Sequence, residues 1–136
     1  MSRLKHHEAP GSSYFVTTKC YQGRTIFQVS ENTEVLIKTL LYYRKEGAYL
    51  LHEFVIMPDH LQVLVTPSPT TNLEGAIQLI KGGSSHRIHS HRNHKVEIWQ
   101  KGFHDWTIRN LVDCHAKTEY RPHKGGVQIV FGRHAT

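Results

Sequence analysis

Two short apolar runs separated by a proline–aspartate pair constrain the fold of this chain most strongly. Residues 54–57 and 61–65 form these runs, and Pro58-Asp59 lies between them. Proline restricts φ and an aspartate side chain hydrogen-bonds nearby backbone, so the pair favours a tight turn. We therefore expect two strands, at 48–57 and 61–65, joined by this turn.

The second of these strands has two different faces. Side chains alternate along a strand, so one side carries His60, Gln62 and Leu64, and the other carries the apolar Leu61, Val63 and Val65. His60 and Gln62 can both bind a metal ion and would lie side by side on a rigid element. The alternative is structural: His60 ends the turn and Gln62 lies on a solvated face of the sheet. Alternation alone favours this alternative.

The charge balance indicates a polyanionic partner. Seventeen Lys and Arg against eleven Asp and Glu give a net charge of +6, and twelve histidines add positive charge at mildly acidic pH. A small domain with this balance is typical of proteins that bind nucleic acid. A basic protein that is merely soluble is the alternative, and net charge does not separate the two.

Composition fits one globular domain that spans 1–136. Hydrophobic residues make up 38% and charged residues 21% of the 136. No stretch approaches the roughly 20 apolar residues of a membrane span, and no apolar segment of a secretory signal follows the basic N-terminus. Cys20 and Cys114 form no CxxC pair and are expected to be reduced thiols. The sequence thus predicts a cytoplasmic protein without a membrane partner.

Capping residues and apolar periodicity predict the elements of the first half. Residues 1–12 are expected to form a mobile basic arm. Residues 14–18, rich in aromatic and β-branched side chains, are expected to form a strand. A helix is expected at about 31–46, with Ser30 as its N-cap and Gly47 as its C′ residue.

A second helix is expected after the N-cap Asn72, and it carries two adjacent glycines. Gly82 and Gly83 each cost about 1 kcal/mol in a helix relative to alanine. They indicate either the close approach of another backbone, nucleic acid included, or a helix that frays at Gly82, and the pattern favours neither. Residues 89–95 are predicted to form a polar connector.

Aromatic and basic side chains interleave in residues 97–109. Trp99, Phe103 and Trp106 would most often be core anchors. Rings exposed beside basic residues would instead form a platform for the bases of a single nucleic-acid strand. We expect Trp99 to lie mainly in the core.

The C-terminal part is predicted to contain one helix and one strand. Asn110 is suited to cap a helix at about 111–120, and Pro122 would stop it. Residues 127–131 have the composition of a strand.

The hexapeptide Met57-Pro58-Asp59-His60-Leu61-Gln62 resembles the signature of the single-tyrosine HUH transposases, small bacterial enzymes that move insertion sequences as single-stranded DNA. Within this family, the sequence resembles the REP-associated branch. That family carries His-hydrophobic-His after Met-Pro-Asp, and both histidines bind a divalent metal. Its members also carry runs similar to Leu-Ile-Lys-Gly-Gly-Ser at 79–84 and Ile-Trp-Gln-Lys-Gly-Phe-His-Asp at 98–105. The first of these runs favours a continuous second helix. The resemblance covers about 14–120.

The order of the expected elements, taken with this resemblance, predicts a ferredoxin-like (RRM-like) α/β fold. An antiparallel sheet would carry helices on one face and would be closed by a C-terminal helix that bears a tyrosine. The resemblance implies a homodimer that cleaves and rejoins single-stranded DNA through a 5′-phosphotyrosine. The DNA partner would be a single strand or a DNA hairpin. Mg²⁺ or Mn²⁺ would be the cofactor.

The resemblance also assigns roles to individual residues. Tyr120, in a Glu-Tyr context, would be the nucleophile. His60 and Gln62 would hold the metal. The residues expected near DNA are Lys81, Arg87, Lys101, His104 and Arg109.

Two departures from the family pattern raise a second hypothesis. Gln62 stands where the family has its second histidine, and a carboxamide is a weaker ligand than imidazole for Mn²⁺. Lys124 stands one turn after Tyr120, where relatives have an amide that completes the metal site, and 121–136 form a divergent tail. A derivative that binds DNA hairpins without cleaving them would show the same departures. An RNA-recognition-motif domain ranks last, because its aromatic signature is missing.

Overall fold

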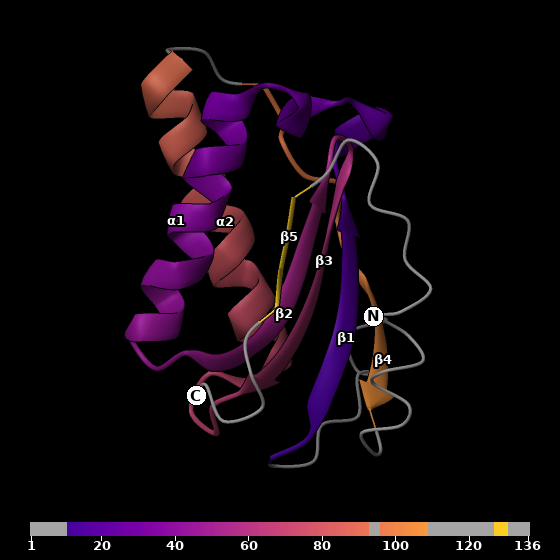
Figure 1. Cartoon of the computed structure of the whole chain (residues 1–136), viewed down its shortest axis with the longest axis vertical. Coiled ribbons are helices and arrows are strands. Elements are labelled where there is room, and N and C mark those ends of the chain that lie inside the picture. The colour runs from indigo at the N-terminus through magenta and orange to yellow at the C-terminus, as the bar shows by residue number, and fades with distance from the viewer. Residues whose placement is uncertain (1–10, 93–95, 109–126, 131–136) are drawn as a thin grey trace.

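The computed structural model describes residues 11–92, 96–108 and 127–130. A five-stranded antiparallel sheet in the order β4-β1-β3-β2-β5 forms one layer, and two helices cover one of its faces (Figure 1). The strands are β1 (Ser13–Lys19), β2 (Tyr49–Met57), β3 (His60–Pro67), β4 (His104–Ile108) and β5 (Val127–Val130), and the α-helices are α1 (Ser30–Lys45) and α2 (Asn72–Arg92). Two short 3₁₀ helices, η2 (Tyr21–Gly23) and η3 (Ile26–Gln28), lie between β1 and α1.

Connectivity confirms the ferredoxin-like prediction. The elements follow one another as β1-α1-β2-β3-α2-β4, with β3 between β1 and β2 and with β4 at the outer side of β1. The predicted strand at 127–131 is present as β5 and extends the sheet beside β2. In the part of the chain that the structure describes, no helix is long and apolar enough to cross a membrane.

The core lies between the sheet and the helices, and β3 contributes to it as its alternation predicts. Leu61, Val63 and Val65 are all fully buried. They pack in one cluster with apolar side chains of both helices, among them Leu36 of α1 and Ile80 of α2. Because these side chains point toward the helices, those at the alternate positions of β3 point to the opposite face of the sheet.

The Pro58-Asp59 turn is held from outside the hairpin. The carbonyl of Pro58 accepts a hydrogen bond from the Phe27 amide, and the carbonyl of Asp59 accepts one from the Cys20 amide, each at 2.9 Å. Cys20 is a buried free thiol, and burial raises its pKa to about 12, so it stays protonated and unreactive. The segment after β1 therefore fixes the turn that precedes His60.

The N-cap residue of α1 is not the one that the sequence predicts. The helix begins at Ser30 itself, Val29 occupies the N-cap position, and no side chain caps it. Asn32 and Thr33 instead donate side-chain hydrogen bonds to the carbonyls of Ile26 and Phe27, at 2.9 and 2.7 Å. These bonds tie the first turn of α1 to the preceding loop.

The end of α1 and the start of α2 follow the capping predictions. Gly47 lies just past α1 with a φ of 85°, the left-handed conformation that glycine adopts without strain. At the start of α2, the Asn72 carboxamide oxygen accepts a hydrogen bond from the Gly75 amide at 2.7 Å.

Helix α2 runs through both glycines without a break, and it continues to Arg92. The predicted connector is therefore wrong for residues 89–92. The ring of His89, read from sequence as part of a polar link, is hydrogen-bonded to the Val96 carbonyl from the last turns of the helix.

The close approach expected at the glycines comes from α1. A Cβ added to Gly83 would lie 3.1 Å from side-chain carbons of Thr39 and of Tyr43, whereas one added to Gly82 would meet nothing within 4 Å. The protein's own helix packing thus explains Gly83. Gly82 is left at an open position.

This difference gives a matched pair of stability predictions. Gly82→Ala is expected to raise the free energy of unfolding by about 0.5–1 kcal/mol, because alanine favours the helix and fits the space. Gly83→Ala is expected to be at least about 1 kcal/mol less stable than Gly82→Ala, because its methyl group crowds α1. Urea denaturation of the two variants measures both values. Equal stabilities would contradict the packing account.

The expected arm (1–12), the expected helix (111–120) and most of the tail (121–136) lie outside the described residues. Gly11, Ser12 and β5 are the described parts of these segments.

Candidate metal and nucleic-acid site

His60 and Gln62 lie on the face of β3 that points away from the helices. In the antiparallel register, His60 is opposite Lys19 of β1, and Gln62 is opposite Thr17. Both side chains are partly exposed. The structure therefore presents an imidazole and a carboxamide two residues apart on a central strand. This is the arrangement that the alternation predicted.

Asp59 orients the imidazole. Its carboxylate oxygen lies 2.8 Å from Nδ1 of His60, with the His60 side chain 25% exposed and that of Asp59 50% exposed. When Nδ1–H donates to this carboxylate, the lone pair of the neutral ring lies on Nε2. A carboxylate at the far nitrogen is the usual support of a metal-binding histidine, because it fixes the tautomer and the orientation of the ring. The sequence pattern predicts only a turn role for Asp59, although the position of this residue next to His60 is the signal for the second role.

His60 and Gln62, called the donor pair below, fit a hard divalent cation that keeps several water ligands. Carboxamide oxygen suits Mg²⁺ and Mn²⁺, and imidazole suits the transition metal better. Among the residues that the structure describes, no group of three or more His, Cys, Asp or Glu is arranged to hold a metal. His60 and Gln62 would supply two of the ligands of such a site.

Removing the Asp59 carboxylate tests the role of its contact with His60. Asp59→Ala is expected to weaken Mn²⁺ binding about 10- to 100-fold, the range seen when such outer partners are removed. Isothermal titration with Mn²⁺ measures the affinity, and Glu97→Ala, an exposed carboxylate outside this turn, is the control. Unchanged affinity in Asp59→Ala would show that His60 does not depend on this hydrogen bond.

The same face of the sheet carries basic and aromatic side chains from β1 and β4. His104 is opposite Thr17 in β1, which is in turn opposite Gln62, so His104 and Gln62 share one row across three strands. His104 and Lys19 are exposed. Lys19 was not singled out from sequence, although extending the alternation of β1 to its last residue would have placed it on this face.

The two tryptophans differ in solvent exposure. Trp99 is 6% exposed and belongs to the core, which confirms the expectation for it. Its indole N–H donates to the Ser84 hydroxyl of α2 at 3.0 Å. Trp106 is 57% exposed, so a core role for this residue is wrong. Phe103 packs against the core as a partly buried side chain.

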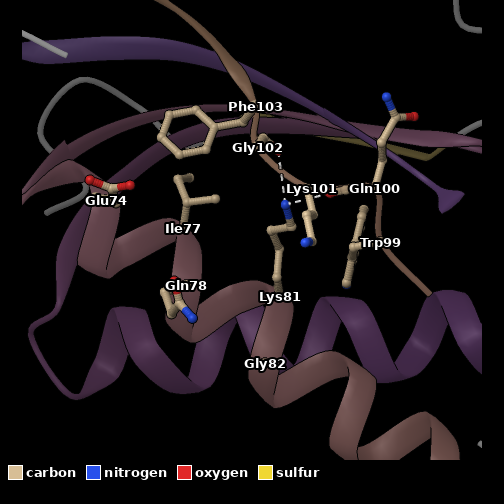
Figure 2. A pocket seen from close by; sticks show the side chains of 10 residues that line it. All are labelled: Glu74, Ile77, Gln78, Lys81, Gly82, Trp99, Gln100, Lys101, Gly102 and Phe103. Atoms are coloured by element: carbon tan, nitrogen blue, oxygen red, sulfur yellow. Dashed lines mark hydrogen bonds between the residues drawn. The ribbon is translucent and has the colours of Figure 1, made fainter. Parts of the chain in front are cut away.

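A groove of about 410 Å³ lies between α2 and the segment that leads into β4 (Figure 2). Lys81 spans it from α2, and its ammonium donates to the carbonyls of Gln100 and Gly102, both at 2.8 Å. Burial lowers the pKa of Lys81. Lys101 is exposed and also lines the groove. Lys81 therefore has a structural contact, and two of its three N–H donors are used there.

The structure does not bring Arg87 to the other predicted DNA contacts. Its guanidinium donates to the Thr39 hydroxyl at 3.2 Å and lies 5.3 Å from the centroid of the Tyr42 ring. These contacts place Arg87 on the helical layer, across the sheet from His60. Arg109 and Tyr120 lie outside the described residues.

Together these features define a ferredoxin-like domain with an imidazole and a carboxamide side by side on the sheet face opposite its helices. The model of the family described as IS200-like transposases matches residues 12–120. The chain therefore belongs to the IS200-like transposase family, whose members process DNA.

Solved structures agree with this fold. A REP-associated tyrosine transposase, solved bound to a REP hairpin, superposes with a TM-score of 0.73 at 20% identity, covering 88% of this chain and 70% of that one. A protein of Deinococcus radiodurans R1 assigned as a transposase superposes with a TM-score of 0.61 at 15% identity, covering 85% of this chain and 92% of that one. No curated protein matches the sequence.

Proposed function

We propose that this protein is a single-stranded DNA transposase that cuts and rejoins a strand through a phosphotyrosine on Tyr120. The observation that carries the proposal is the His60–Gln62 pair on β3, supported by Asp59, in a chain of the IS200-like family. The strand that supplies this pair is central in the sheet, and its turn is held by two external hydrogen bonds. Such a scaffold suits a site whose ligands must keep their geometry.

The chemistry divides among a few residues. Bound Mg²⁺ or Mn²⁺ would polarise the scissile phosphate and offset its developing charge. His60 would supply an imidazole nitrogen, and Gln62 a carboxamide oxygen. The phenol oxygen of Tyr120 would attack phosphorus, the bond to the 3′ oxygen would break, and a free 3′ hydroxyl would leave. The 5′-phosphotyrosine keeps the energy of the broken bond for the reverse attack by a 3′ hydroxyl.

Basic side chains would hold the strand. Lys101 and His104 are exposed on consecutive parts of the segment that enters β4, and this supports phosphate contacts there. Lys81 would donate its third N–H to a phosphate from inside the groove. Arg109, the residue that follows β4 in the sequence, would contact another phosphate. Arg87 would contact DNA only from the helical layer.

The partner we propose is a DNA hairpin with a single-stranded flank, bound by a homodimer. A similar fold solved with a REP hairpin supports this choice of partner. A net charge of +6 suits a polyanion of either strandedness.

The second candidate function is hairpin binding without cleavage. Gln62 favours it, because a carboxamide binds Mn²⁺ more weakly than the histidine that the family places there. The two functions share fold and partner and differ only in whether a covalent intermediate forms.

A cleavage assay separates the two functions. Single-stranded DNA from the flanks of the gene would be incubated with the protein and Mn²⁺ or Mg²⁺, and denaturing gels would detect a covalent protein–DNA band. The transposase proposal expects a band that requires metal. A band from Gln62→His alone would indicate an impaired site, and no band from either protein, with hairpin binding intact, would favour the second function.

A further inference from the structure

Trp106 is an exposed aromatic residue to which the proposed chemistry gives no role. Of the large apolar side chains in the described part of the chain, it is the most exposed, at 57%. It lies in the middle of β4, a short strand that pairs with β1. A large ring that is more than half exposed on a rigid strand is suited to stacking on a ligand.

The register places Trp106 on the same face as the metal donor pair. It lies opposite Phe15 of β1, and Phe15 lies opposite Leu64 of β3, the next residue after Gln62 on this face. Two strand spacings sideways and two residues along the strand put the Cα atoms of Trp106 and Gln62 roughly 12 Å apart. A few nucleotides of a single strand span that distance.

The surroundings of the ring favour a polyanionic strand. His104, two residues before Trp106 on the same face, is exposed, and so is Lys19 at the end of β1. Lys101 is exposed at the start of the same segment. Cations beside an exposed aromatic face are the recurring arrangement for single-stranded nucleic acid, in which the bases stack and the phosphates pair with the cations.

We propose that Trp106 stacks on an unpaired base of the DNA strand and thereby positions the neighbouring phosphate over His60 and Gln62. Trp106 is thus a positioning residue that holds a base and takes no part in bond breaking. This inference rests on the proposed function for the identity of the ligand, but it requires binding only. It therefore remains testable in a protein that does not cleave.

The two tryptophans make fluorescence a direct readout. Trp99 is buried, so quenching by added DNA reports on Trp106. Titrating the Tyr120→Phe protein with a single strand from the gene flank should quench fluorescence to saturation. The same titration of the Trp106→Phe, Tyr120→Phe protein should leave it nearly unchanged. A blunt duplex of the same sequence should quench less, because its bases are already stacked.

Affinities of three variants complete the test. By fluorescence anisotropy of a labelled strand, Trp106→Ala should bind about 10-fold or more weakly, whereas Trp106→Phe, which keeps a ring, should lose less. Val29→Ala, which removes another exposed apolar side chain, is the control and should not change affinity. Circular dichroism and thermal melting would show that all variants are folded.

The outcomes separate this inference from the proposed function. Unquenched fluorescence on saturation, or equal affinity of Trp106→Ala and wild type, overturns the stacking role even if the covalent band forms. Quenching and a weaker Trp106→Ala complex without any covalent band support stacking and overturn cleavage. A Trp106→Ala protein that changes from dimer to monomer in sedimentation while its monomer keeps full affinity would assign the ring to a subunit interface, and this too overturns the inference.

Discussion

Replacing Tyr120 by phenylalanine is expected to abolish the covalent protein–DNA band and to lower strand cleavage at least about 10³-fold, as losses of a nucleophile do. The substitution keeps the ring and removes only the oxygen that attacks phosphorus. Binding of the hairpin should be unchanged, because a phosphotyrosine forms only after the strand is bound. Denaturing gels measure the band, and a gel-shift assay measures the binding.

The other tyrosines provide the control. Tyr14 and Tyr49 are buried, and the Tyr49 hydroxyl donates to the Leu40 carbonyl at 2.7 Å, so neither phenol can reach DNA. Tyr42 is 45% exposed and is the matched test case. Tyr42→Phe should cleave at the wild-type rate. A Tyr120→Phe protein that still forms the band would contradict the assignment of the nucleophile.

Replacing His60 by alanine has the second-largest expected effect. It removes the imidazole from the donor pair and leaves the Asp59 carboxylate without its partner. Cleavage with Mn²⁺ should fall at least about 100-fold, since the scissile phosphate loses its electrostatic support. Rates at saturating DNA and a series of Mn²⁺ concentrations measure the loss. The effect should exceed that of Asp59→Ala, which acts only through His60.

Gln62→His is the paired variant with the opposite sign. An imidazole in place of the carboxamide should tighten Mn²⁺ binding and shift the Mn²⁺ concentration that gives half-maximal cleavage downward by about 10-fold. With Mg²⁺ the gain should be smaller, because Mg²⁺ prefers oxygen ligands. A His60→Ala protein as active as wild type, or a Gln62→His protein that needs more Mn²⁺, would contradict this metal site.

The sequence predicted the parts of the fold that local chemistry determines. Pro58-Asp59 forms the expected turn, and the alternation of β3 correctly separated His60 and Gln62 from the buried Leu61 and Val63. These features follow from backbone geometry and burial alone. A pattern of period two needs no knowledge of the rest of the chain.

The parts that failed depend on contacts that the local sequence pattern does not reveal. The polar residues 89–92 are typical of a connector, yet the helix continues through them, and His89 is hydrogen-bonded to the Val96 carbonyl. Gly83 is explained by Thr39 and Tyr43 of the other helix, which no local pattern reveals. Tryptophan is a residue type that most often lies in the core, and only the position of β4 in the sheet shows that Trp106 is exposed.

The candidate site divides in the same way. The placement of His60 and Gln62 on one face of the sheet was predicted because both residues lie on one strand. The supporting contact of Asp59 with His60 and the contacts of Lys81 with two carbonyls depend on side-chain geometry. The approach of Lys19 and His104 depends on strand order, which brings together residues from the two ends of the domain.

Mass spectrometry of the covalent adduct tests the central claim most directly. The protein would be incubated with a flanking single strand and Mn²⁺, digested with nuclease and protease, and the modified peptide sequenced. We predict a nucleotide attached through its 5′ phosphate to Tyr120, absent when metal is chelated. A nucleotide on any other residue, or no modified peptide from a protein that binds the hairpin, would contradict the account.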